Sequence, residues 1–421
     1  MAFSFPRHRP DFWTWITISI VAVLCILLIL PILRVLTLGF IDPDTGSLTL
    51  DNFIEVFTRN YYLNGLKNTL FVGALGTLGA CLIGIPLAFF TTRFLITGKT
   101  LISTLAILVL VSPPFISAYA WIMMMGSNGV ITNFFGGIGI NIPTIYGAHG
   151  IILVFSLKFF PFIFLMTQTA LTAVNKSFED AAENLGCSPW QRFVKVTLPL
   201  VFPAVSTGAI ICFVLSIADF GTPAILGRGF RTLSTIALSA YRSELGGPPT
   251  MAVTVSILMM AISMIALVAQ RRILANRRYA SSLTNLPVAV KLSGWKNAAV
   301  HFFSHGIVFL AMLPSAVVVY TSFLKTKGPV FVGGFGLESY DRIWRDAPDA
   351  IYNSFLFAII AVTFITITSG LISYVIVRRD TKAAAAIDFL MMVPYLVPGV
   401  VMAIGFVTVF RNGMPNFFGP A

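Results

Sequence analysis

Long runs of apolar residues constrain this chain more than any other feature of its sequence. About nine windows reach the roughly 20 residues that a helix needs to cross about 30 Å of hydrocarbon. They cover residues 13–38, 64–91, 100–125, 146–172, 200–225, 250–270, 297–324, 351–377 and 384–410. These runs are apolar on every side, whereas the strands of a membrane barrel alternate polar and apolar residues. The sequence therefore predicts an all-α polytopic membrane protein with about nine transmembrane helices, embedded in a lipid bilayer.

The composition agrees with this class, and the basic residues orient the helices. Of 421 residues, 57% are hydrophobic and 10% are charged, and the mean hydropathy is +0.88. Lys and Arg concentrate before the first predicted span and in the loops after the second, fourth, sixth and eighth spans, which are alternate loops. By the positive-inside rule, these loops and the N-terminus are predicted to be cytoplasmic. The net charge of +12 therefore reflects topology and does not indicate a nucleic-acid partner.

The chain also contains an internal repeat. Segments 50–93 and 337–379 share a short amphipathic lead-in, an Asn, an apolar span and an Arg-containing turn, and a proline-bearing span follows each. The matched prolines are Pro113 and Pro114 in the first copy and Pro394 and Pro398 in the second. Because an even number of predicted spans separates the copies, the repeat is parallel, unlike the inverted repeats of many secondary transporters. We predict a first repeat over 1–285 and an incomplete second repeat over 286–421, within a natural chain that continues to a second copy of the loop described next.

The loop 177–199 is unusually rich in charged and capping residues. Ser177 and Asp180 have the spacing of an acidic capping box, which predicts that a helix starts at about residue 178. Gly186 can take the left-handed conformation that ends a helix. Ser188, followed by Pro at the first helical position and Gln at the third, predicts a second helix that leads into the fifth span. The loop is therefore expected to fold as helix, turn and helix.

The first of these helices has a small apolar face ringed by carboxylates. The apolar positions, which share the spacing of one helical face, are Phe178, Ala181, Ala182 and Leu185. The acidic positions are Glu179, Asp180 and Glu183. Helices that lie on lipid usually present Lys and Arg above bulky apolar residues. A shallow face ringed by acid is better suited to a groove on a protein, so we expect this loop to dock on a partner.

The same residues carry a resemblance to a known family. "DAAENLG" at 180–186, followed by "TLP" at 197–199, resembles the cytoplasmic loop signature of ABC importer permeases. That signature is Glu-Ala-Ala, three residues, Gly, nine residues and Ile-x-Leu-Pro. The matching positions are Ala181, Ala182, Gly186, Leu198 and Pro199. Asp180 stands where the family has Glu, and Glu179 is adjacent, so the sequence leaves open which carboxylate makes the family's contact.

With its two homologous halves, the chain is most similar to fused iron(III)-type permeases. The resemblance implies a type I ABC importer permease of the bacterial inner (plasma) membrane, whose loop 177–199 couples to a dimer of ABC ATPase subunits. It also implies a periplasmic or extracellular substrate-binding protein, with ATP and Mg on the ATPase and no cofactor, metal site or enzymatic activity on this chain. The expected cargo is iron(III) or a small iron complex. A small anion such as sulfate or a phosphonate, a polyamine, and ion-coupled secondary transport stay open as alternatives.

Two charged residues fall inside predicted spans. Lys158 lies near the middle of the fourth span and Asp219 near the outer end of the fifth, where "DFGTP" should loosen the helix. Charges in hydrocarbon are costly, so Lys158 should face a cavity or a carboxylate; a structural pair and a substrate path are both open for it. For Asp219 an outer-interface position is preferred over a path. The candidate path residues are Lys158, Asp219, Pro113, Pro114, Pro394 and Pro398.

Two further patterns have structural interpretations. Gly76, Ala80 and Gly84 recur every four residues, which predicts a close helix contact in the second span. His301 and His305 lie four residues apart at the start of the seventh span, but no third ligand is near in sequence. We interpret them as an interfacial pair and predict no metal site.

Overall fold

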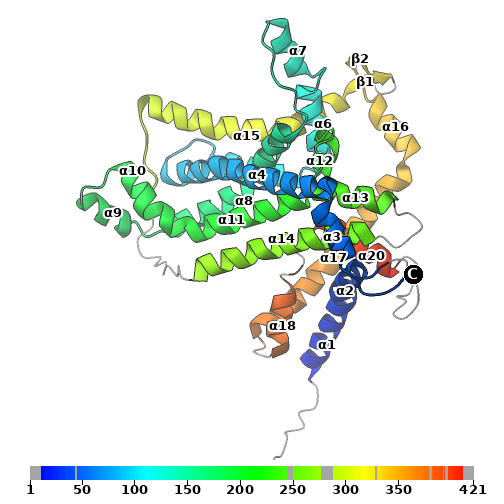
Figure 1. The fold of residues 1–421 in the computed structure, drawn as a ribbon. Coiled ribbons are helices and arrows are strands. Elements are labelled where there is room, and N and C mark those ends of the chain that lie inside the picture. The colour runs from blue at the N-terminus through cyan, green and yellow to red at the C-terminus, as the bar shows by residue number, and fades with distance from the viewer. Residues whose placement is uncertain are drawn as a thin grey trace, which may run out of the picture.

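The computed structural model describes residues 11–42, 45–243, 250–275, 288–327, 330–378, 382–391, 393 and 397–410. Its body is a set of long helices that lie roughly side by side (Figure 1). These are α4 (Asn60–Arg93), α8 (Ala148–Ala173), α11 (Leu198–Ala218), α14 (Thr250–Ala275) and α15 (Gly294–Ser322), with α5 (Lys99–Val111) packed on α8 and α15. We call the end of this body that carries α9 and α10, on the left in Figure 1, the loop end.

Shorter elements connect and cover these helices. The first span consists of α1 (Phe12–Leu24), the π-helical turn η1 (Cys25–Ile29) and α2 (Leu30–Gly39). The connecting helices are α3 (Asp51–Thr58), α6 (Pro114–Met125), α7 (Val130–Gly137), α9 (Ser177–Asn184), α10 (Pro189–Arg192), the π-helical turn η2 (Phe193–Thr197), α12 (Gly221–Leu226) and α13 (Leu233–Ser243). After α15 come β1 (Leu324–Lys327), β2 (Val330–Phe335), α16 (Glu338–Asp346), α17 (Pro348–Arg378), α18 (Lys382–Leu390) and α20 (Gly399–Phe410). The two strands pair antiparallel, with Leu324 opposite Phe335 and Thr326 opposite Phe331.

The helices confirm a polytopic membrane fold, with a lower count of continuous spans than expected. Within the described residues, seven helical spans are long and apolar enough to cross a membrane, or eight with one bent pair included. The window 100–125 is that bent pair: the chain turns by 104° between α5 and the helical segment that follows it. Ser112 and Pro113 are extended there, because a residue before proline avoids the helical conformation. The window 384–410 is also divided into two helices, α18 and α20. Some of the residues between these two helices are not among those that the structure describes.

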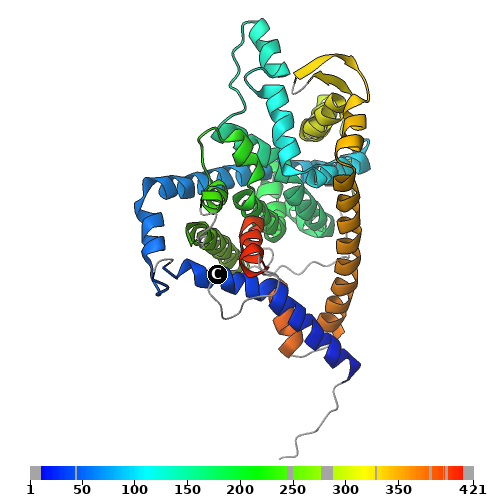
Figure 2. The same ribbon diagram turned by 90° about the vertical axis from the view of Figure 1, so that its right-hand side faces the viewer.

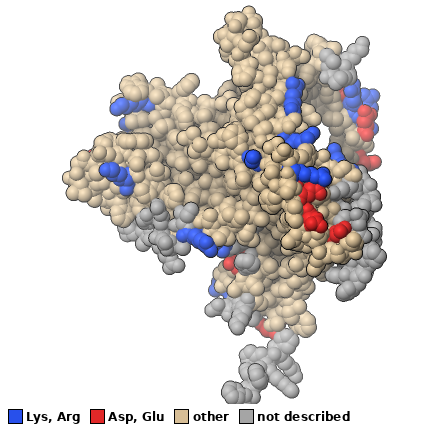
Figure 3. Space-filling view, in the orientation of Figure 1, with Lys and Arg blue, Asp and Glu red and all other residues tan. Residues whose placement is uncertain are grey.

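The charged side chains on the visible face agree with a membrane-embedded body. Lys, Arg, Asp and Glu lie mainly toward the two ends of the long helices, and a belt of uncharged side chains lies between (Figure 3). Large apolar side chains such as Leu78 and Leu82 of α4 are exposed, as expected of positions that contact lipid rather than water.

The predicted small-residue contact is confirmed as the packing of α4 on α8. A Cβ atom on Gly76 would lie 2.8 Å from the Cβ of Phe155, and one on Gly84 would lie 2.9 Å from the carbonyl oxygen of Phe160. Ala80 is fully buried in the same interface. The small residues let the two backbones approach, so that the α8 phenylalanines fill the space between helices. This interface, with α11 packed on both helices, forms the main core.

The two copies of the predicted repeat have the same order of elements but different surroundings. A short helix precedes a long helix that ends in Arg in both copies: α3 with α4, and α16 with α17. Val56 of α3 is buried, whereas its counterpart Ile343 in α16 is exposed. Helix α17 stands at the edge of the molecule (Figure 2), and its apolar side chains are largely exposed. The predicted boundary between 1–285 and 286–421 lies outside the described residues.

Candidate functional site

The loop 177–199 folds as two helices joined by a glycine turn, as predicted. Helix α9 ends at Asn184, and Gly186 follows with φ of +82°. The N–H of Gly186 donates to the carbonyl of Glu183, and the N–H of Cys187 donates to the carbonyl of Ala182. These two bonds are those of a Schellman C-cap, which needs the left-handed conformation that glycine takes without steric cost.

The start of α9 differs from the prediction. Ser177 is the first helical residue rather than the N-cap, and the preceding Lys176 makes no side-chain cap. Instead, the Asn175 side-chain oxygen accepts a hydrogen bond from the backbone N–H of Ser177 at 2.9 Å. Asn serves this role as well as Ser does, and it occurs two residues earlier, so the proposed box between Ser177 and Asp180 was wrong.

The second helix starts as predicted and continues into the fifth span. Ser188 accepts a hydrogen bond from the Gln191 backbone, and the Gln191 side chain accepts one from the Ser188 backbone, which completes a capping box. Helix α10, the π-helical turn η2 and α11 then form one continuous helical span, Pro189–Ala218. The second half of the loop is therefore a rigid extension of a membrane-spanning helix.

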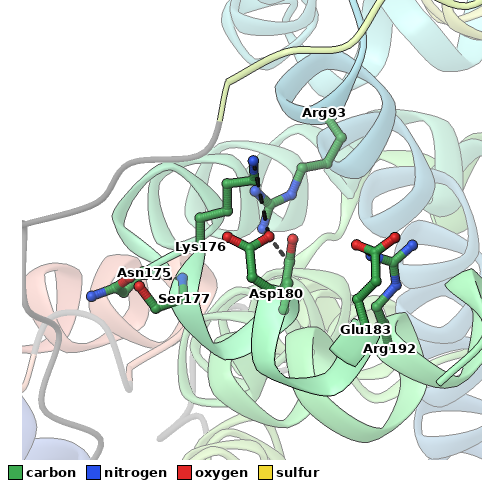
Figure 4. A network of polar contacts seen from close by, with 8 residues as sticks. Arg93, Asn175, Lys176, Ser177, Asp180, Glu183 and Arg192 are labelled. Atoms are coloured by element: carbon green, nitrogen blue, oxygen red, sulfur yellow. Dashed lines mark hydrogen bonds and ion pairs between the residues drawn. The ribbon is translucent and has the colours of Figure 1, made fainter. Parts of the chain in front are cut away.

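The three carboxylates of the loop have different environments. Glu179 points inward: its Oε1 accepts hydrogen bonds from Nη2 of Arg93 at 2.6 Å and from Oγ1 of Thr197 at 2.7 Å. Glu183 pairs with Arg192 across the glycine turn (Figure 4). Asp180 is more exposed than Glu179 and less exposed than Glu183, and its contact is with Lys176 at 3.9 Å. Of these three carboxylates, Asp180 has the longest ion-pair contact, and it is better placed than Glu179 to meet a partner.

Part of the apolar face of α9 is exposed to solvent and part is buried within the chain. Phe178, Ala181 and Leu185 are exposed, and Leu185 is 85% exposed. Ala182, expected on the same outer face, is buried against the chain itself. On the second half of the loop, Trp190 is exposed as well. The exposed part of this apolar face therefore excludes Ala182, because the Schellman turn folds α10 and η2 back onto that side of α9.

Leu198 and Pro199, the last residues of the signature, are half-buried in the first turn of α11. They do not belong to the exposed surface of the loop. Pro199 lies inside the continuous helical span Pro189–Ala218, just after the π-helical turn η2. These two residues position the loop on α11.

Lys158 and Asp219 form a buried ion pair inside the body. Nζ of Lys158 lies 2.5 Å from Oδ2 of Asp219, and the two side chains are 11% and 3% exposed. Asp219 sits where α11 ends, and its Oδ1 accepts a hydrogen bond from the Thr222 N–H at the start of α12. The Asp219 side chain is thus buried within the protein, and the predicted loosening of the helix at "DFGTP" is confirmed.

The described prolines among the candidate path residues lie next to helix ends. Pro113 lies at the break between α5 and α6, and Pro398 is buried just before α20. The side chain of Pro114 and all of Pro394 lie outside the described residues.

Nε2 of His301 accepts a hydrogen bond from the Thr97 N–H at 3.2 Å, and its Nδ1 lies 2.9 Å from the Asn297 carbonyl. His301 thus ties α15 to the turn after α4.

Residues 80–279 match the family described as "Binding-protein-dependent transport system inner membrane component". A ferric transport system permease protein of Actinobacillus pleuropneumoniae is 26% identical over 94% of this chain and 58% of its own length. A Haemophilus influenzae protein with a similar ferric transport name is 27% identical over 93% of this chain and 64% of its own length. The chain thus spans about three fifths of the length of these curated relatives.

A solved structure has the same fold. It is a bacterial alginate ABC transporter in complex with an alginate pentasaccharide-bound periplasmic protein, with a TM-score of 0.50 and 17% identity over 65% of this chain and 95% of that chain. The fold defines a multi-pass helical membrane protein. The match over residues 80–279 makes this chain similar to the binding-protein-dependent transport system inner membrane component family.

Sequence reasoning missed two residues of this site, Arg93 and Thr197. Arg93 was used only to orient the second span and to align the internal repeat, and Thr197 was counted only as part of the "TLP" signature. Both contact Glu179, which is 86 and 18 positions away from them in the sequence. Arg93 did carry one signal, since a charge that directly ends an apolar span must find either water or a partner.

Proposed function

We propose that this chain is the transmembrane permease subunit of an ATP-driven ABC importer. The observation that carries the proposal is the exposed apolar surface of the loop 177–199 within the segment that matches the family. In this reading, the loop end and the N-terminus are cytoplasmic, and the loop docks on a dimer of ABC ATPase subunits that hold ATP and Mg²⁺. A substrate-binding protein then delivers cargo at the opposite end, where α12 and α13 lie.

The docking surface has the properties of a small protein interface. Phe178, Leu185 and Trp190 are large apolar side chains in a loop that otherwise carries charges, and such anchors supply most of the binding energy at interfaces. Capping at Ser188 and the Schellman turn at Gly186 hold them in place before binding. A preordered loop loses less entropy when it docks than a flexible one does.

The docking proposal predicts a strong effect of a charge at Leu185. Leu185→Glu should weaken ATPase binding by about 2 kcal/mol or more, roughly thirtyfold in affinity, because it places a carboxylate inside a desolvated interface. The amount of ATPase that co-purifies with the membrane complex measures this. Leu48→Glu is the matched control, because Leu48 is 84% exposed, like Leu185 at 85%, but lies outside the loop 177–199. Equal ATPase recovery with both variants would contradict docking through this loop.

For the cargo, we propose iron(III) or a small iron complex, supported by the ferric transport names of both relatives. Cells that depend on the gene for this chain should take up radioactive iron(III), and deletion of the gene should abolish that uptake while leaving sulfate uptake unchanged. Loss of sulfate uptake with normal iron uptake would instead assign a small-anion cargo. Uptake that persists without ATP but collapses with the proton gradient would favour secondary transport.

A further inference from the structure

Arg93, at the loop end of α4, joins that helix to two other parts of the chain. Its guanidinium donates to Glu179 at 2.6 Å, and the two side chains are only 9% and 18% exposed. The same carboxylate oxygen accepts the Thr197 hydroxyl of η2 at 2.7 Å. One buried carboxylate therefore connects α9, η2 and the end of α4.

An aromatic contact supports this junction. The rings of Phe89 in α4 and Phe193 in η2 meet edge to face at 4.8 Å. The chain itself ties the loop to α8 through residues 174–176 and to α11 through η2. Helix α4 has no covalent link to the loop and packs on α8 and α11, and the Arg93 ion pair and this ring contact join it directly to α9 and η2.

The same residue also meets the segment that leads into α15. The backbone N–H of Val290 donates to the Arg93 carbonyl at 2.9 Å, and the N–H of Leu95 donates to the Val290 carbonyl at 3.1 Å. The ring of Phe90 contacts Phe303 of α15. A displacement of the end of α4 would therefore move the lead-in to α15 with it.

We propose that Glu179 is a positioning residue that acts inside this chain, and that the Glu179–Arg93 pair transmits movement of the loop 177–199 to α4. This inference rests on the proposed function, in which an ATPase moves the loop. Asp180, not Glu179, is then the carboxylate available to the partner. The buried position of Glu179 supports this assignment, because an ATPase contact would require it to leave two hydrogen bonds, one of them charge-assisted.

Glu179→Gln tests the proposal, with Glu55→Gln as the matched control, because Glu55 also pairs with an arginine, Arg59, but lies in α3, outside the loop 177–199. Gln keeps an oxygen for the Thr197 hydroxyl but removes the charge that holds Arg93. The complex should retain its ATPase and hydrolyse ATP, while the amount of cargo transported per ATP hydrolysed falls about tenfold or more, as expected for loss of a charge-assisted bond. Glu55→Gln should leave this ratio unchanged. Reconstituted proteoliposomes allow hydrolysis, transport and ATPase recovery to be measured on the same sample.

The double variant Glu179→Gln with Arg93→Gln separates transmission from folding. It leaves no unpaired buried charge, so the protein should reach the membrane in normal amount, but the ratio of transport to hydrolysis should stay low. Recovery of normal transport in the double variant would show that the pair serves stability only and would overturn the proposal. Loss of ATPase from Glu179→Gln but not from Asp180→Asn would also overturn it, because Glu179 would then be the partner contact. Failure of the wild-type chain to bind any ATPase would instead refute the proposed function.

Discussion

Replacing Lys158 by Met is expected to remove most of the folded protein from the membrane. The substitution leaves the Asp219 carboxylate, which is 3% exposed, without its ion-pair partner at 2.5 Å. Breaking a buried pair by removing one member typically costs about 3–5 kcal/mol, because the remaining charge stays desolvated. Asp219 also caps the start of α12, so its displacement would release the turn between α11 and α12. The amount of protein in the membrane and its thermal stability in detergent measure the loss.

Two further variants make this prediction specific. Lys158→Met with Asp219→Asn should recover much of the folded protein, because Asn can still accept the Thr222 N–H and no charge is left unpaired. Lys67→Met, at an exposed position of α4, should have little effect on stability. Normal protein levels with reduced uptake in the single variant Lys158→Met would contradict a structural pair. That result would place Lys158 on the substrate path.

Replacing Gly84 by Ala is expected to loosen the packing of α4 on α8. The added Cβ would lie 2.9 Å from the Phe160 carbonyl oxygen and 3.0 Å from the Phe164 backbone nitrogen. Backbone atoms cannot rotate away as a side chain can, so the two helices must separate. Overpacking of this kind typically costs about 1–3 kcal/mol. A fall in thermal stability of the purified protein in detergent measures the effect.

Gly306→Ala is the matched control for Gly84→Ala. Gly306 also lies inside a long helix, α15, but a Cβ there would meet no atom within 4 Å. Alanine is also the better helix former, so this variant should be neutral or slightly more stable. An equal loss of stability in both variants would mean that helix propensity rather than the approach of α4 to α8 decides the effect.

The spans and the helix-turn-helix form of the loop 177–199 could be predicted because local chemistry controls them. An apolar run must form a helix in lipid to satisfy its own backbone, whatever surrounds it. The cap at Ser188 and the turn at Gly186 depend on residues within one or two helical turns. The spacing of Gly76, Ala80 and Gly84 likewise predicted a close contact, since small side chains in hydrocarbon are useful mainly where helices meet.

What the local pattern could not decide is which charges meet. Glu179 and Asp180 are adjacent and chemically alike, and only the position of Arg93 beside α9 turns one inward and leaves the other exposed. In the same way, Lys158 and Asp219 each had several allowed surroundings, and the packing of α8 against α11 brings them together. Periodicity shows which face of a helix is apolar but carries no information about the neighbouring helix. Pairing of buried charges across helices is therefore a property of the tertiary structure.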